Sequence, residues 1–234
     1  MTLSPLHLIK STQLICSAAI IFLHGSDSSG PEISNLITSL VGNSSFPSHI
    51  NFYFPTAPAR FYMPLQKITN VWFNRYNITP GDPEDSDGIE ESAEEIKKLI
   101  YEIIEMDEVP VNRIVVGGFS MGGAQALHMA YRFTPGVAGV FALSSFLNND
   151  SAIFGNEKIP DIPLHMSHGK QDPFIFFPWG FETFEKLTKL GVRNAEFVGI
   201  NNSSHELKKN ELLGLFDWIQ NIVPPLEDNE SNDI

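Results

Sequence analysis

Three residues of this chain could together carry out acyl transfer: Ser120, Asp172 and His205. A serine hydroxyl is a poor nucleophile at neutral pH until a base takes its proton, and histidine is the usual base because imidazole has a pKa near 6.5. A carboxylate must then orient the imidazole. The three residues follow one another in the order Ser, Asp, His, each soon after an apolar segment. The sequence therefore predicts Ser120 as nucleophile, His205 as base and Asp172 as orienting acid.

Ser120 lies at the centre of the segment Gly118-Phe119-Ser120-Met121-Gly122. The apolar run 113–117 before it is typical of a strand, and apolar residues recur at helical spacing after it. A serine in such a strand-turn-helix has a strained backbone and an exposed hydroxyl, and the flanking glycines relieve crowding. The segment has neither the lysine of a P-loop nor the spacing Gly-x-Gly-x-x-Gly, so no nucleotide cofactor is predicted.

Acyl transfer also needs hydrogen-bond donors for the negative oxygen of the tetrahedral intermediate. We predict that the backbone N–H groups of Met121 and of Ser26 supply them, the latter from the polar loop 24–30 after an apolar strand. His24, in the same loop, is given a supporting role. His165 and His168 are predicted to point to different faces of the sheet, so the sequence predicts no zinc site and no cofactor of any kind.

The elements that must position these residues alternate between strand-like and helix-like segments, which predicts an α/β fold. We expect a single domain over residues 1–225, with a mostly parallel central sheet and helices on both faces. The segment 61–78 has aromatic residues without clean periodicity and is expected to be a long loop. Strands are expected at 6–10, 18–23, 51–54, 113–117, 137–144, 162–167 and 195–199, and helices at 31–41, 87–109, 121–134, 179–190 and 212–222.

The charge of the chain limits its partners. Fifteen Lys and Arg against 28 Asp and Glu give a net charge of -13, which disfavours nucleic acid and anionic membrane surfaces. No segment is predicted to insert stably into a bilayer, which leaves only transient membrane contact. The acidic stretches 82–95 and 227–233 are interpreted as solvated, and 226–234 as a disordered acidic tail. A single cysteine, Cys16, excludes an intrachain disulfide and favours the cytoplasm.

Several motifs agree in order and spacing with those of one protein family. They are Leu23-His24-Gly25-Ser26, 55–58, 71–73, 117–123, 137–144, His168-Gly169 with Asp172, and His205-Glu206-Leu207. Together they resemble the acyl-protein thioesterase and lysophospholipase family of α/β-hydrolases, and Met121, 145–148 and 205–207 look most like its lysophospholipase-like branch. The match runs from about residue 18 to residue 218. One departure is Asp27-Ser28, where the family commonly has Gly-Asp.

The resemblance implies a cytosolic serine hydrolase that cleaves thioesters of S-acylated proteins or small carboxylic esters through the triad named above. It also implies a shallow acyl pocket that favours short chains. The bulky residues Trp72, Phe73, Phe174 and Phe176 are predicted to line and shorten that pocket. Three alternatives stay open: a lysophospholipase acting on single-chain phospholipids, a peptidase, which would need a larger gating domain, and a catalytically silent binding protein of the same fold.

Overall fold

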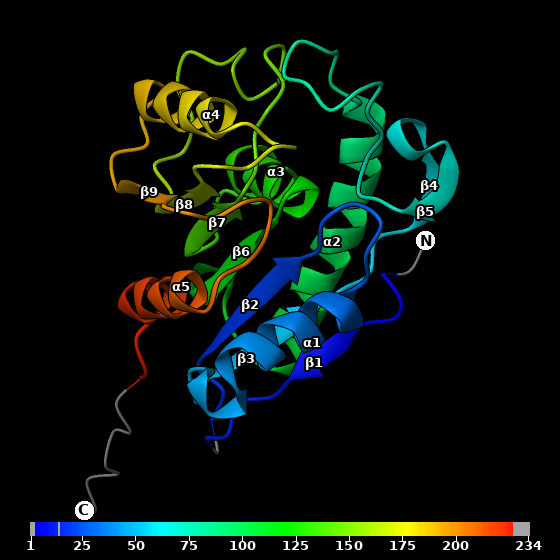
Figure 1. The fold of residues 1–234 in the computed structure, drawn as a ribbon. Helices are drawn as coiled ribbons and strands as arrows, with labels where there is room; N and C mark the ends of the chain where they lie inside the picture. Colours follow the sequence, from blue (N-terminus) through cyan, green and yellow to red (C-terminus); the bar gives the residue numbers. More distant parts are fainter. Residues whose placement is uncertain (1–2, 14, 227–234) are drawn as a thin grey trace, which may run out of the picture.

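The computed structural model describes residues 3–13 and 15–226, so most of the predicted acidic tail lies outside the described residues. A seven-stranded sheet runs through the centre in the order β1-β3-β2-β6-β7-β8-β9 (Figure 1). All neighbouring strands in it are parallel except β1, which pairs antiparallel with β3. The prediction of a mostly parallel sheet is confirmed. Its strands are β1 (His7–Ile9), β2 (Ala18–Leu23), β3 (Ile50–Phe54), β6 (Ile114–Phe119), β7 (Gly139–Leu143), β8 (Leu164–Gly169) and β9 (Ala195–Ile200).

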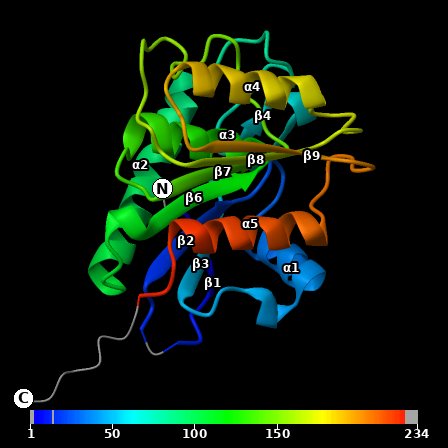
Figure 2. The same ribbon diagram turned by 90° about the vertical axis from the view of Figure 1, so that its left-hand side faces the viewer.

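Helices cover both faces of this sheet, as Figure 2 shows in an edge-on view. Helices α1 (Gly30–Val41) and α5 (Lys209–Ile222) lie on one face, and α2 (Ser86–Met106), α3 (Met121–His128) and α4 (Phe177–Lys189) lie on the other. Because side chains alternate along a strand, neighbours such as Ile20 and Ile21 belong to opposite apolar cores. Burial on both faces explains why β2 is apolar along its whole length. None of the described helices could cross a membrane.

The segment between β3 and α2 differs from the expected loop. Strands β4 (Ala59–Tyr62) and β5 (Lys67–Asn70) pair antiparallel and form a separate two-stranded sheet, joined through a 3-10 turn at Met63–Leu65. Each strand has only four residues, too few for alternation to stand out in the sequence. This hairpin lies beside the amino end of α2 (Figure 1), where Arg60 Nη1 donates to Glu91 Oε2 at 3.0 Å.

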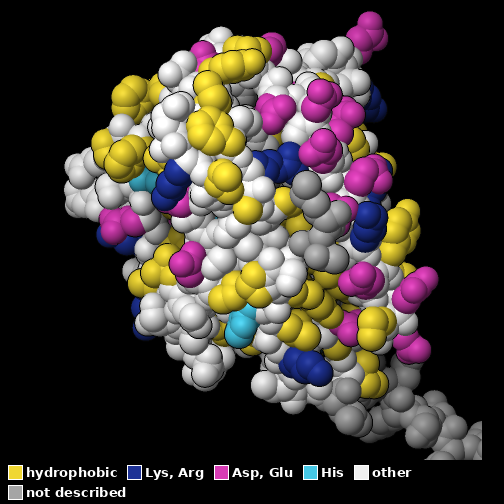
Figure 3. Space-filling view, turned by 90° about the vertical axis from the view of Figure 1, so that its right-hand side faces the viewer, with side chains coloured by type: hydrophobic (Ala, Val, Ile, Leu, Met, Phe, Trp, Pro, Cys, Tyr) yellow, Lys and Arg dark blue, Asp and Glu magenta, His cyan; other side chains and the backbone are white. Residues whose placement is uncertain are grey.

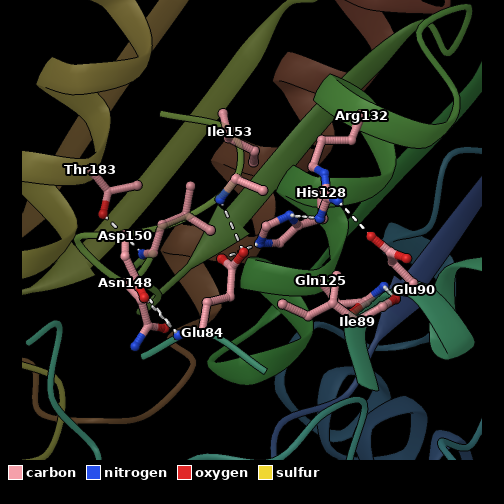
Figure 4. A network of polar contacts seen from close by, with 12 residues as sticks. Glu84, Ile89, Glu90, Gln125, His128, Arg132, Asn148, Asp150, Ile153 and Thr183 are labelled. Carbon is pink, nitrogen blue, oxygen red and sulfur yellow. Dashed lines mark hydrogen bonds and ion pairs between the residues drawn. The ribbon is translucent and has the colours of Figure 1, made fainter. Parts of the chain in front are cut away.

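The acidic stretch 82–95 is not uniformly solvated, contrary to the interpretation of the sequence. Asp85 caps α2 by accepting a hydrogen bond from the Gly88 N–H, so the helix starts at Ser86, one residue before the expected start at residue 87. The Glu84 side chain is only 3% exposed, and its Oε2 lies 3.0 Å from Nε2 of the buried His128 (Figure 4). Later acids of α2, such as Glu90, are exposed. Figure 3 shows one face of the molecule on which many acidic side chains reach the surface.

Candidate active site

Ser120, Asp172 and His205 come together at the carboxyl edge of the sheet, just beyond the ends of β6, β8 and β9. Ser120 Oγ lies 3.1 Å from His205 Nε2, so the hydroxyl can donate to that nitrogen. His205 Nδ1 lies 2.7 Å from Asp172 Oδ2 and can donate to it. Serine, imidazole and carboxylate are thus joined in the sequence of contacts that activates a serine nucleophile.

The turn at Ser120 holds the backbone in a conformation that few residues adopt. Ser120 has φ 55° and ψ -121°, and its N–H donates to the Leu143 carbonyl at 2.8 Å. Strand β2 passes so close that a Cβ at Gly118 or Gly122 would lie 2.5 Å or 2.2 Å from the Leu23 carbonyl oxygen. The two glycines are therefore required by contact with β2, and the strained turn presents the serine hydroxyl above the sheet.

Asp172 is buried and held by its own loop. Its Oδ1 accepts hydrogen bonds from the N–H groups of Phe174 and Ile175, both at 2.9 Å. Burial alone would raise the pKa of Asp172, but the hydrogen bonds from His205 and from the two backbone amides outweigh it and lower that pKa below its ordinary value. The carboxylate therefore stays ionised at neutral pH and fixes the orientation of the His205 ring.

The two predicted oxyanion donors border a small cavity beside Ser120. Within the described residues, neither the Ser26 N–H nor the Met121 N–H donates a hydrogen bond, which leaves both free for a ligand. His24 fixes the loop that carries Ser26: its Nδ1 donates to the Gly25 carbonyl at 2.6 Å, and its Nε2 accepts from the Ala57 N–H at 2.9 Å. Burial lowers the pKa of His24 to about 4, so the ring stays neutral, as these two bonds require.

The hairpin β4–β5 also contacts the loop 24–30, which carries Ser26. Asp27 has φ 61°, and its N–H donates to the Asn70 carbonyl at 3.1 Å. Its carboxylate accepts from Lys67 Nζ at 2.7 Å and from Thr69 Oγ1 at 2.5 Å. An aspartate thus occupies a left-handed position that glycine would favour, and its side chain ties the oxyanion loop to β5.

Two of the predicted pocket residues lie in the core instead. Trp72 is fully buried and Phe73 is 2% exposed, and neither borders the cavity beside Ser120. Trp72 Nε1 donates to the His24 carbonyl at 2.9 Å, and the two rings lie 5.2 Å apart. The pocket role predicted for Trp72 and Phe73 therefore needs correction. Trp72 supports the oxyanion loop from behind, because its indole N–H finds a partner there that the sequence does not reveal.

The other two predicted pocket residues lie on the surface around the triad. Phe174 is 64% exposed, and its ring lies 6.0 Å from the His205 ring. Phe176 is 50% exposed and packs on Trp179. Neither borders the small cavity, whereas the intervening Ile175, which is buried, does. Within residues 174–176, only the middle side chain therefore borders the cavity beside Ser120.

The cavity beside Ser120 has a volume of about 20 Å³. Most of the residues that line it were not predicted from the sequence. A separate groove of about 540 Å³ also borders Arg75; its lining residues fall between 63 and 87 and include no triad residue. In the sequence, the one indication of a polar cavity wall is the single arginine, Arg75, in the aromatic segment 71–78. Besides Ser26, Ser120 and Met121, the cavity is lined by Tyr62, Arg75, Ile78, Ser144, Ser145, Phe146 and Ile175.

His165 and His168 do not converge on a common site. His165 Nδ1 contacts Glu196 Oε1 at 2.6 Å, whereas His168 Nε2 donates to the Ile175 carbonyl at 2.8 Å. Burial lowers the pKa of both rings, so both are neutral at pH 7. Over the described ranges, no three histidine, cysteine or acidic side chains gather as metal ligands.

Comparisons with known proteins show the family of the chain. Residues 6–223 match the phospholipase/carboxylesterase family. Lysophospholipase-like protein 1 of Mus musculus is 40% identical over 221 residues, which cover 92% of this chain and 91% of that protein. Acyl-protein thioesterase 1 homolog 2 of Dictyostelium discoideum is 32% identical over 222 residues, covering 92% and 96%.

The fold agrees as well. The crystal structure of Zea mays acyl-protein thioesterase 2 superposes with a TM-score of 0.77 at 24% identity, covering 93% of this chain and 98% of that one. The sequence resemblance is thus confirmed over nearly the whole chain. The chain therefore belongs to the phospholipase/carboxylesterase family of α/β-hydrolases.

Proposed function

We propose that this serine hydrolase cleaves thioesters or carboxylic esters of short acyl groups, with Ser120 as the residue that is acylated. Serine hydrolase activity follows from membership of the family. The observation that carries the assignment of residues is the hydrogen-bonded chain from Ser120 through His205 to Asp172, with the small cavity beside it. An intact chain of this kind disfavours a catalytically silent scaffold.

The proposed reaction has two halves. His205 Nε2 takes the Ser120 proton while Oγ bonds to the substrate carbonyl carbon, and the carbonyl oxygen becomes negative between the N–H groups of Ser26 and Met121. His205 then gives its proton to the departing thiol or alcohol, which leaves an acyl-enzyme. A water molecule, deprotonated by the same nitrogen, attacks this ester, and the carboxylic acid leaves as Ser120 recovers its proton.

The size of the cavity supports a preference for short acyl groups. A cavity of about 20 Å³ has room for only a small group next to the scissile carbonyl, not for a long acyl chain. Each methylene of an acyl chain adds about 0.8 kcal/mol of binding only where it is buried, so a long chain gains nothing once it meets the wall. This argues against the lysophospholipase alternative, whose substrates carry long chains.

We place the enzyme in the cytoplasm, where a chain with a single cysteine is at no disadvantage. Its proposed substrates are S-acylated proteins or small esters and thioesters. The net charge of -13 disfavours nucleic acid as a partner. Contact with a membrane would be transient and made through an acylated substrate.

A series of acyl thioesters from acetyl to palmitoyl tests the proposal, with kcat/KM measured below each critical micelle concentration. We expect kcat/KM to be highest for the shortest members and turnover to vanish in Ser120→Ala. A steady rise toward palmitoyl would contradict the short pocket. Turnover at the wild-type rate by a folded Ser120→Ala variant would contradict the mechanism.

A further inference from the structure

Arg75 brings a buried positive charge to the wall of the cavity beside Ser120. The residue is 6% exposed, and its guanidinium carbon lies 5.0 Å from the ring centroid of Phe73 and 4.2 Å from that of Phe146. Its side chain makes one hydrogen bond within the described part of the chain, from Nη1 to Asn148 Oδ1 at 3.0 Å. A guanidinium has further N–H donors in a planar fork, so donors remain for a ligand.

The acids nearest to Arg75 do not neutralise it by contact. The charges of Glu84 and Asp82 act on Arg75 only at a distance, and no ion pair to Arg75 forms among the described residues. The Glu84 carboxylate is occupied by His128 and by the Ala152 N–H, both at 3.0 Å. Figure 4 shows this network, with Glu84 directed toward His128 and Asn148 set beside it. Burial lowers the pKa of Arg75 only to about 10, so the side chain is charged at neutral pH.

Two buried hydroxyl groups in the same wall have no partner. Ser144 and Ser145 are each 1% exposed, and their Oγ atoms find no hydrogen-bond acceptor or donor. Both residues line the cavity, as does the buried phenol of Tyr62. Buried polar atoms are nearly always paired in native proteins, so unpaired hydroxyls here point to a polar group that completes the site. A hydrocarbon chain would leave the hydroxyl groups of Ser144 and Ser145 unsatisfied.

We infer that the cavity binds a carboxylate, and that the preferred substrates are half-esters or half-thioesters of short dicarboxylic acids. The inference rests on the proposed function and specifies its acyl group. Arginine is suited to this role because its fork matches the two oxygens of a carboxylate. The cavity is small, so the acid must follow the scissile carbonyl closely. Arg75, Ser144 and Ser145 are specificity residues in this account, and the triad supplies the rate.

A matched pair of substrates isolates the effect of the carboxylate. Malonyl and 3-methylbutanoyl thioesters of N-acetylcysteamine have the same branched shape, with a carboxylate in one and an isopropyl group in the other. The quantity measured is the ratio of their kcat/KM values. The intrinsic reactivities of the two substrates cancel when this ratio is compared between variants.

We expect Arg75→Met, which keeps an unbranched apolar side chain beside the two rings but removes the guanidinium, to lower the acid-to-neutral ratio by about tenfold to hundredfold. Arg193→Met is the control, because it removes a positive charge from an exposed ion pair with Asp161 and should leave the ratio unchanged. Arg75→Lys, which keeps a charge without the fork, should lie between wild type and Arg75→Met.

The outcomes separate the two proposals. If the neutral thioester is hydrolysed and the ratio is the same in wild type and Arg75→Met, Arg75 is structural and the inference is wrong. If the wild type hydrolyses neither thioester, the proposed function itself fails. Should Arg75→Met not fold, inhibition of wild type decides: malonate must inhibit hydrolysis of the neutral thioester more strongly than 3-methylbutanoate does, and equal inhibition would overturn the inference.

Discussion

The triad and the acyl cavity lie next to each other but are built in different ways. Ser120, Asp172 and His205 stand on loops that leave the carboxyl ends of β6, β8 and β9, so the sheet fixes their relative positions. The cavity wall combines residues from 62–78 with residues 144–146 after β7. These segments are placed by side-chain contacts between distant parts of the chain, such as that of Arg75 with Asn148. Rate and specificity should therefore respond to different substitutions.

The largest effect is expected on the triad side. Asp172→Asn should lower kcat by about 10⁴ for every acyl chain length, because the His205 ring loses the acceptor that fixes its tautomer. The order of preference among acyl groups should not change. Asp161→Asn is the matched control, since Asp161 binds Arg193 on the surface and should tolerate the change. A selective loss in Asp161→Asn, with Asp172→Asn active, would refute the triad assignment.

A smaller effect is expected where the two regions meet. Trp72→Phe removes the hydrogen bond to the His24 carbonyl, which is worth about 1 kcal/mol and should lower kcat about fivefold through the oxyanion loop. Because Trp72 does not border the cavity, the dependence of kcat/KM on acyl chain length should stay as in the wild type. A shift of the optimum toward longer chains at an unchanged rate would place Trp72 in the pocket after all.

The smallest effect on turnover is expected at Glu84, behind the cavity. Burial alone would raise the pKa of Glu84, but the bonds from His128 and the Ala152 N–H outweigh it and lower that pKa from 4.5 to about 2. Since the folded pKa is the lower one, Glu84 contributes stability that is complete above the unfolded pKa and is lost as the pH falls from about 4.5 toward 2. At about 1.4 kcal/mol per pKa unit, this amounts to about 3 kcal/mol at most.

Urea unfolding at a series of pH values checks this contribution. We expect the free energy of unfolding to fall less steeply between pH 4.5 and pH 2 in Glu84→Gln than in the wild type, while kcat at neutral pH changes by less than about threefold. Glu90→Gln, an exposed acid paired with Arg132, serves as control and should keep the wild-type slope. Equal slopes for all three proteins would mean that the Glu84 carboxylate makes no stabilising contact in the folded state.

The triad, which the sheet positions, could be predicted from the sequence, whereas the cavity, which depends on side-chain contacts between distant segments, could not. The elbow at Ser120 depends on glycines that lie within a few residues of it and on one neighbouring strand, so a local pattern carries it. Asp172 and His205 could be predicted because the loops that follow parallel strands meet at one edge of the sheet. No comparable local pattern or sheet geometry determines which residues line the cavity. Trp72 and Phe73 turn inward, Arg75 reaches the cavity, and Ile175 enters it in place of Phe174 and Phe176, all through contacts with residues far away in the chain.

Covalent labelling with a fluorophosphonate tests whether Ser120 is the activated nucleophile. A fluorophosphonate reacts only with an activated serine, and the mass of the intact protein followed by peptide mapping gives both the stoichiometry and the site. The account predicts one phosphonyl group per chain, on Ser120, and no labelling of a folded Ser120→Ala variant. Labelling of another serine, or equal labelling of wild type and Ser120→Ala, would contradict it.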